Sequence, residues 1–164
     1  MKHKKRILYL TYAAAVAAAY AVLTFVSSSL GMASGVVQVR LSEALCTLAY
    51  FTPAAVPGLA VGCFAANLIT GCVPADIIFG TVATAVGAAA AYRIRHLHPV
   101  LSPIPSIIVN TLSVPFILKY GYGVDAGIPY LMLSVGIGEV ISCGVLGIFL
   151  LYSVKKLGIL KEKR

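Results

Sequence analysis

The chain has 164 residues, of which 60% are hydrophobic and 11% are charged, and its net charge is +8. Its mean hydropathy of +0.95 excludes an ordinary soluble domain, in which about a quarter of the residues are charged. The basic residues gather at the chain ends and in one short internal segment, a distribution that marks membrane topology and argues against nucleic-acid binding. The composition therefore predicts a single integral membrane domain, residues 1–164.

The first apolar segment covers residues 7–30 and follows a basic cluster that includes Lys4, Lys5 and Arg6. Its apolar run is longer than the h-region of a secretory signal peptide, so we expect a retained helix. A surface of small residues lets another helix approach closely, either within the chain or on a partner. Such residues recur here every four positions, as Ala13, Ala17 and Ala21 in one series and Ala14 and Ala18 in another.

Five further apolar segments follow, separated by Gly, Pro and Asn or Ser. A helix that spans a bilayer needs about 17–25 residues, so the shorter segments depend on their neighbours. The segments cover residues 36–51, 56–70, 77–92, 104–119 and 128–152. The sequence thus predicts an all-α fold, a polytopic bundle of six transmembrane helices.

Six spans place both chain ends on one side of the membrane. If that side is the cytoplasm, Arg40 and Lys119 are the two of 13 basic residues that lie outside. Positive charge concentrates in cytoplasmic segments, so we expect both termini to be cytoplasmic. The lipid bilayer is then the first partner, and its anionic lipids attract the basic ends.

Two charged residues, Arg40 and Glu43, stand at the head of the second predicted span. A charge at such depth costs about 2.5–3.5 kcal/mol on insertion scales, so it usually pairs with another charge or faces a polar cavity. Their three-residue spacing puts both on one face of a helix and within reach of each other. Two interpretations stay open, namely a helix-end ion pair and a binding site.

Other polar residues converge at a similar depth in the later spans, namely Asn67, Asp76, Asn110 and Glu139. The inner half of the bundle offers almost none, which predicts a pocket open to the outside and no continuous pore. Structural roles also fit some of them, because Asp76 suits a helix N-cap and the asparagines suit bonds between helices. Glu139 is the strongest functional candidate, since its glycine-rich run GIGEVISCG leaves room for a ligand or a neighbouring backbone.

The sequence contains no Walker-type phosphate loop, no H-E-x-x-H and no G-x-S-x-G motif. Its four cysteines show no C-x-x-C spacing, and its three histidines lie in the basic segments. We therefore expect no enzyme activity, no metal site and no cofactor. Any ATP that drives the protein must be hydrolysed by other subunits.

Four motifs occur in order, VRLSEAL, YFTPAAVPGL, GCFAANLITG and DIIFGTVAT, and a Gly-Glu pair follows in the last span. In residues 37–147 the chain resembles the QueT family of queuosine-precursor transporters. This resemblance implies a substrate-binding (S) component of an energy-coupling-factor (ECF) importer in the bacterial cytoplasmic membrane. Such proteins are six-helix bundles that dock onto an ECF module, made of one transmembrane coupling subunit and two ATPases. The alanine-rich first helix resembles the docking surface of other S components.

The substrate implied by this resemblance is a 7-deazaguanine, either an aminomethyl or cyano precursor or queuine. A carboxylate suits the guanine-like edge as a two-point acceptor, which favours Glu139 or Glu43 there. Asp76 or the other glutamate would then lie near a cationic aminomethyl arm.

The ring carbonyl needs a donor such as Arg40 or Asn67. Tyr50, one heptad beyond Glu43, or its neighbour Phe51 is expected to stack on the heterocycle. The predicted substrate-binding residues are Arg40, Glu43, Tyr50, Asn67, Asp76, Asn110 and Glu139. The predicted docking residues are Ala13, Ala14, Ala17, Ala18 and Ala21.

Three alternatives remain. An S component for another vitamin would share the fold and differ in its pocket. An autonomous proton-coupled carrier would use Glu139 to exchange proton and substrate. A non-transporting assembly factor would bind no small molecule, and the charged cluster argues against it.

Overall fold

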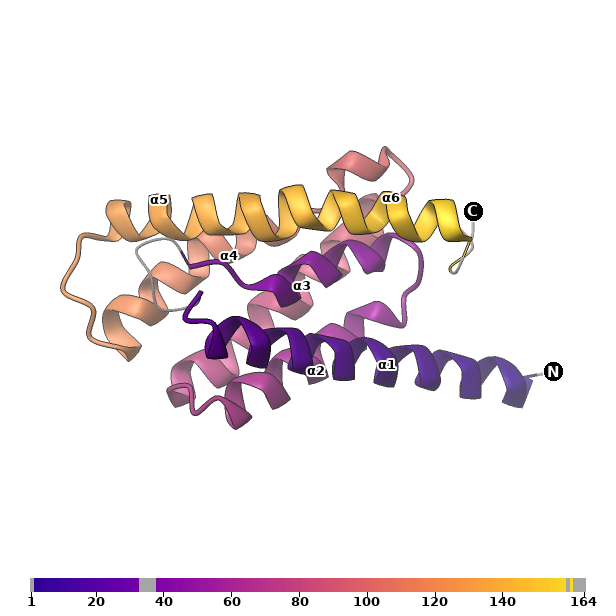
Figure 1. The fold of residues 1–164 in the computed structure, drawn as a ribbon, viewed down its shortest axis with the longest axis horizontal. Helices are drawn as coiled ribbons and strands as arrows, with labels where there is room; N and C mark the ends of the chain where they lie inside the picture. The colour runs from indigo at the N-terminus through magenta and orange to yellow at the C-terminus, as the bar shows by residue number, and fades with distance from the viewer. Residues whose placement is uncertain (1, 33–37, 159, 161–164) are drawn as a thin grey trace.

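The computed structural model describes residues 2–32, 38–158 and 160, and the regular structure in this part of the chain is helical throughout (Figure 1). The predicted all-α, six-helix architecture is confirmed. In chain order the elements are α1 (Lys2–Ser29), the 3₁₀ helix η1 (Leu41–Tyr50), α2 (Ala55–Ile69), η2 (Asp76–Gly80) continued by α3 (Thr81–Ile94), the short turn η3 (Pro99–Leu101), α4 (Ile104–Phe116) continued by η4 (Ile117–Gly121), and α5 (Ile128–Glu139), η5 (Val140–Leu146) and α6 (Gly147–Leu157) in one long rod.

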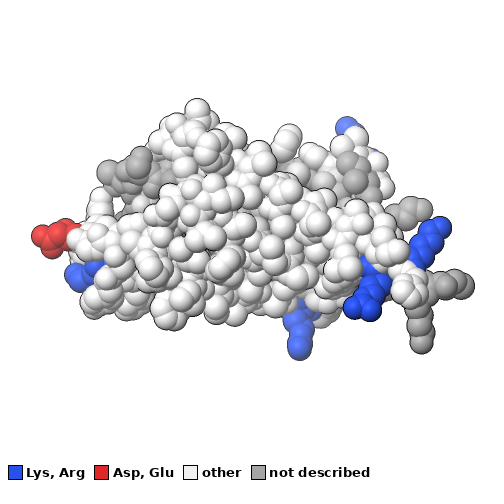
Figure 2. Space-filling model, turned by 90° about the horizontal axis from the view of Figure 1, so that it is seen from below, with Lys and Arg blue, Asp and Glu red and all other residues white. Residues whose placement is uncertain are grey.

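Four of these helices are long and apolar enough to cross a membrane, whereas α2 is a shorter apolar helix and η1 has ten residues. Helix η1 lies inside the bundle, packed against α1, α2, α3, η5 and α6. Figure 2 shows charged side chains toward the two ends of one long face and an uncharged stretch between them. This pattern suits a protein whose sides contact hydrocarbon and whose ends contact water.

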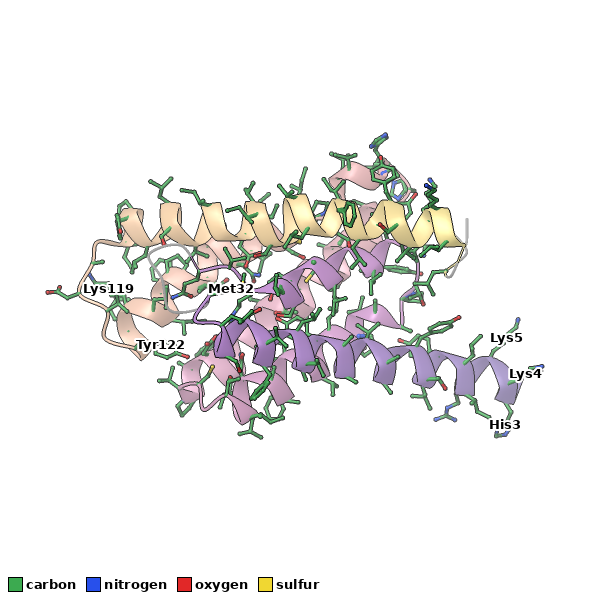
Figure 3. The ribbon with its side chains drawn as sticks, in the orientation of Figure 1. His3, Lys4, Lys5, Met32, Lys119 and Tyr122 are labelled. Atoms are coloured by element: carbon green, nitrogen blue, oxygen red, sulfur yellow. The ribbon has the colours of Figure 1, made fainter. Side chains whose placement is uncertain are left out.

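The two ends of the bundle differ in charge. Lys4 and Lys5 mark the end where both chain termini lie, which we call the basic end, and Lys119 and Tyr122 mark the opposite end (Figure 3). The basic residues Arg93 and Arg95 lie at the C-terminal end of α3, and the whole of α4 and η4 separates them from Tyr122. The loops at the end marked by Tyr122 border a polar cavity between the helices.

The second predicted span begins too early in the sequence. It was expected from residue 36. Residues 36 and 37 lie outside the described part of the chain, residues 38–40 form no helix, and η1 begins at Leu41. The backbone at Arg40 has φ −104° and ψ 106°, and its N–H donates to Ser142 Oγ at 3.1 Å instead of entering a helix. A hydrogen bond from Arg40 to η5 therefore takes the place of the first helical turn that hydropathy predicts.

The glycine run around Glu139 allows the segment before η1 to lie close against α5. A side chain at Gly138 would overlap the backbone carbonyl of Gln38. Of the two uses that the sequence suggested for these glycines, Gly138 therefore serves the approach of a neighbouring backbone.

Helices α1 and α2 pack unusually closely. A Cβ atom at Gly58 would lie 2.6 Å from the backbone oxygen of Ala13, and one at Gly62 would lie 2.9 Å from that of Ala17. The predicted small-residue series on α1 is thus divided between two environments. Ala13 and Ala17 face α2 and Ala21 packs on the core, whereas Ala14 and Ala18 are exposed.

We expect Gly58→Ala to lower the free energy of unfolding by about 1–2 kcal/mol, because the added methyl group must push two backbones apart. Gly144→Ala is the matched control, since a Cβ atom added there would lie 3.7 Å and 3.8 Å from its two nearest neighbouring atoms, at ordinary contact distance. Thermal unfolding of both variants in detergent, followed by circular dichroism, measures the difference. Equal melting temperatures would contradict the close helix contact.

Candidate functional site

A cavity of about 290 Å³ opens between the helices toward the end marked by Tyr122. Tyr122 and Val124, from the loop before α5, and Thr70 and Cys72, from the loop after α2, contribute to its walls. Its polar lining includes five of the residues that the sequence predicts, namely Arg40, Glu43, Asp76, Asn110 and Glu139. Apolar side chains such as Val114, Ile117, Leu118 and Val135 fill the remaining wall.

Two carboxylates, Glu43 and Glu139, meet in the cavity around one amide. Asn110 Nδ2 lies 3.4 Å from Glu43 Oε2 and 3.0 Å from Glu139 Oε1, and donates to both. Glu43 is 2% exposed and also accepts from the Tyr20 hydroxyl and, at 3.2 Å, from the Cys46 thiol. Glu139 is 8% exposed, and its Oε2 atom has no hydrogen-bond partner among the described residues. One carboxylate is therefore fully satisfied by protein donors, and the other retains an unused acceptor.

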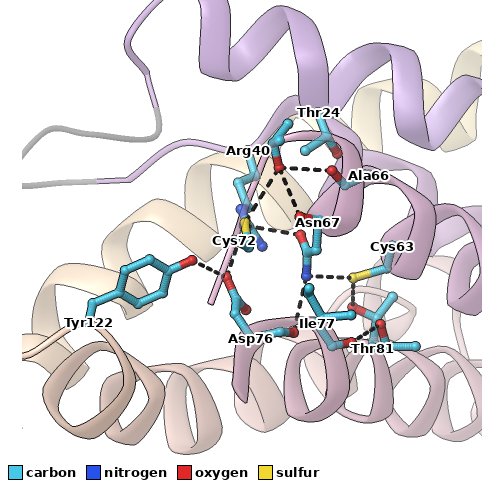
Figure 4. Close-up of polar contacts among 12 residues, drawn as sticks. Thr24, Arg40, Cys63, Ala66, Asn67, Cys72, Asp76, Ile77, Thr81 and Tyr122 are labelled. Atoms are coloured by element: carbon cyan, nitrogen blue, oxygen red, sulfur yellow. Dashed lines mark hydrogen bonds and ion pairs between the residues drawn. The ribbon is translucent and has the colours of Figure 1, made fainter. Parts of the chain in front are cut away.

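A second polar group lies around Arg40 and Asp76 (Figure 4). Arg40 Nη2 is 3.6 Å from Asp76 Oδ2 and 3.5 Å from Asn67 Oδ1, to which it donates. Tyr122 donates its hydroxyl to Asp76 Oδ2 at 3.0 Å. Burial, a hydrogen bond with the Cys72 thiol and the charge of Asp76 raise the pKa of Tyr122, so its hydroxyl stays a neutral donor. Together these contacts tie the segment before η1 to η2 and to the loop before α5.

Arg40 and Glu43 line the same cavity but do not form the predicted helix-end ion pair. The ion pair that the structure gives Arg40 is with Asp76. The extended backbone at Arg40 removes it from the helix face on which that interpretation depended. The N-cap interpretation of Asp76 is also wrong, because the helix already begins at Pro74 and Asp76 lies inside it.

The two asparagines differ in position. Asn110 lines the cavity and bridges the glutamates, so it lies between helices and beside the open space at once. Asn67 lies behind the cavity wall, where its Nδ2 donates to the backbone oxygen of Asp76 at 3.1 Å. Because Asn67 also accepts from Arg40, it orients both members of the ion pair.

Tyr50 does not reach the cavity. It is buried in the apolar core, where its ring packs edge-on against Phe51. The sequence argument assumed an α-helix, in which a residue seven positions on returns to within about 20° of the same face. In the 3₁₀ helix η1, with about three residues per turn, the same step leaves Tyr50 about 120° away from Glu43.

Two tyrosines of the site, Tyr122 in the cavity lining and Tyr20 buried behind Glu43, were not predicted from the sequence. Tyr20 interrupts the alanine-rich stripe of α1, and its hydroxyl donates to Glu43. Tyr122 follows η4 and reads as an interfacial aromatic residue by position alone. A large polar aromatic side chain inside a stripe of alanines is the signal that would have identified Tyr20.

Neither a curated protein nor a solved structure matches the chain significantly. A family model does match, over residues 10–156, and it describes the QueT transporter family. The match covers nearly the whole chain, including every residue that lines the cavity. The chain therefore belongs to the QueT transporter family, a family of membrane transporters.

Proposed function

We propose that this protein is the substrate-binding (S) component of an ECF importer and that it captures a queuosine precursor of the 7-deazaguanine class. Membership of a transporter family supports a small-molecule substrate and transport, not catalysis. The observation that carries the proposal is the cavity, which is lined by the carboxylates of Glu43, Asp76 and Glu139 together with Arg40 and Asn110. A volume of about 290 Å³ suits one small fused-ring ligand, since typical small-molecule sites begin near 300 Å³.

The chemistry of the lining fits a guanine-like ring. Such a ring presents adjacent N–H donors along one edge and a carbonyl oxygen along another, and carboxylates and Arg or Asn side chains are the complementary groups. Glu43, Glu139 and Asn110 supply the acceptors and one donor, and Arg40 supplies a guanidinium group near Asp76. Tyr122 takes the place of Tyr50 in the proposal as the aromatic side chain beside the heterocycle.

The direction of capture follows from the charge distribution. The basic end would face the cytoplasm under the positive-inside rule, so the cavity, which lies toward Tyr122, would open to the outside. The sequence has no phosphate-binding loop of its own, so ATPase subunits of an ECF module would supply the energy. The exposed alanines Ala14 and Ala18 on α1 remain available for docking such a module.

Calorimetric titration of the purified, ligand-stripped protein tests the substrate class. We expect aminomethyl-7-deazaguanine, cyano-7-deazaguanine or queuine to bind, and guanine and riboflavin to produce no specific heat. The ring nitrogen that distinguishes guanine from a 7-deazaguanine adds an acceptor to a carboxylate-rich site. Absence of binding by every deazaguanine would overturn the proposed substrate.

Uptake into cells or vesicles with and without the ATPase subunits tests the proposed mechanism. Loss of uptake without the ATPases supports an S component. Uptake that persists without them would favour the autonomous carrier, for which the unpartnered oxygen of Glu139 is the relevant observation.

A further inference from the structure

Building on the proposed function, we infer that Tyr20, Thr24 and Ser27 of α1 are positioning residues for substrate binding. We call these three residues the polar face of α1. None of them belongs to the described lining of the cavity. They hold the start of η1 in place, and that part of the chain supplies Arg40 and Glu43 to the cavity wall.

The burial pattern of α1 sets this face apart. Most of the helix is exposed, and its described buried residues are Val16, Tyr20, Thr24 and Ser27. Their spacing of four, four and three residues places them on one side of the helix. The last three carry hydroxyl groups and are 1%, 2% and 0% exposed. Because a buried hydroxyl group is costly without a hydrogen-bond partner, such a face requires specific partners on the element packed against it.

Those partners are three consecutive residues at the start of η1. The Leu41 N–H donates to Ser27 Oγ at 3.0 Å, the Thr24 hydroxyl donates to Ser42 Oγ at 2.7 Å, and the Tyr20 hydroxyl donates to Glu43 Oε1. Successive residues of η1 thus bond to successively earlier residues of α1. The two elements run in opposite directions and are fastened at three neighbouring points.

The start of η1 depends on these bonds because its own helix cannot supply them. The first N–H groups of a helix have no partner within it, and Arg40 at the N-cap makes no side-chain capping bond. Ser27 provides the acceptor that Leu41 needs, and on the other side Ser142 accepts from the Arg40 N–H at 3.1 Å. The cavity-lining end of η1 is therefore held between α1 and η5 by bonds from outside its own helix.

Loss of a bond from α1 should weaken binding without any change in the cavity lining itself. When only a fraction of the molecules hold the binding residues in place, the apparent affinity falls by that fraction. Arg40 is the lining residue most directly affected, because it precedes Leu41 in the chain and 23% of its side chain is exposed. A purely structural role would lower the melting temperature and leave the folded molecules unchanged. The dissociation constant, measured far below the melting temperature, therefore separates positioning from stability.

Calorimetric titration of Thr24→Val with aminomethyl-7-deazaguanine, cyano-7-deazaguanine and queuine tests the inference. Valine keeps the shape of threonine and removes the donor to Ser42. We expect the binding of whichever precursor the wild type binds to weaken about three- to tenfold, which corresponds to the loss of one hydrogen bond. Thr24→Ser restores the hydroxyl group and should bind within about twofold of the wild type. Thr11→Val is the matched control on the same helix, since the Thr11 hydroxyl donates to the Ile7 backbone oxygen of α1 itself.

Hydrogen exchange of the ligand-free protein tests the same inference without a substrate. The amides of residues 41–43 should exchange faster in Thr24→Val than in the wild type, because this end of η1 opens more often. Thr11→Val should leave their exchange unchanged.

The outcomes separate this inference from the proposed function. Wild-type affinity of Thr24→Val for a deazaguanine, or unchanged exchange at residues 41–43, would overturn the positioning role and leave the proposed substrate intact. If no deazaguanine binds the wild type, the proposed substrate fails and the exchange measurement decides the positioning role alone. If Thr24→Val fails to fold, Tyr20→Phe removes another bond of the same face and is judged by the same criteria.

Discussion

Replacement of Glu43 by alanine is expected to lower the free energy of unfolding by about 2–4 kcal/mol and to abolish substrate binding. Glu43 is 2% exposed, and three donors converge on it, from Tyr20, Cys46 and Asn110. Removal of the carboxylate leaves the buried Tyr20 hydroxyl without its acceptor and opens a void beside it. Because each orphaned buried donor costs free energy, the loss should exceed that of an ordinary polar truncation.

Circular dichroism melts and calorimetric titration measure the two effects separately. Glu43→Gln keeps an oxygen for Tyr20, so it should retain more stability than Glu43→Ala while still weakening substrate binding. Asp125→Ala removes an exposed carboxylate and should change neither quantity. A melting temperature of Glu43→Ala equal to that of the wild type would show that these contacts contribute nothing to folding.

The ion pair between Arg40 and Asp76 should behave as a coupled unit. We expect Arg40→Gln to destabilise the protein by about 1–3 kcal/mol, because it leaves the Asp76 carboxylate, 8% exposed, without its cation. The range is set below that of a fully buried pair because 23% of the Arg40 side chain is exposed. The same variant should weaken substrate binding at least about tenfold, since Arg40 lines the cavity.

A double-mutant cycle isolates the pair. The double variant Arg40→Gln/Asp76→Asn should lose about 1 kcal/mol less unfolding free energy than the two single variants lose in sum. The reason is that no charge is left unpaired in the double variant. Tyr122→Phe serves as a separate control, since it removes a donor to Asp76 and leaves the ion pair in place. Strictly additive effects of the two single substitutions would mean that the two charges do not interact.

The fold was largely predictable because hydropathy and joint residues report membrane spans directly. Six helical regions appear in the predicted order, four of them long and apolar enough to cross a membrane, and the prediction is least accurate where the chain is enclosed by other helices. The start of η1 was placed five residues too early, at residue 36 in place of Leu41. A local hydropathy pattern carries no information on the hydrogen bond from the Arg40 N–H to Ser142 Oγ, about a hundred positions later in the chain.

The candidate site was predictable in composition and less so in pairing. Depth along each span brought Arg40, Glu43, Asp76, Asn110 and Glu139 to one cavity. Which of them pair depends on helix type and on close backbone approaches, and local spacing does not report either. The prediction for Tyr50 failed for this reason, since it assumed an α-helical repeat where the chain forms a 3₁₀ helix.

The short length of η1 has a consequence for how the protein meets its bilayer. Ten residues of 3₁₀ helix rise about 20 Å, well short of a hydrocarbon layer of about 30 Å. A lipid-facing helix of that length would have to thin the membrane around it. Residues Ser42 to Tyr50 are all buried, however, and η1 is surrounded by five other elements. Hydrophobic mismatch is therefore set by the longer outer helices, and the segment that carries Glu43 is insulated from changes in membrane thickness.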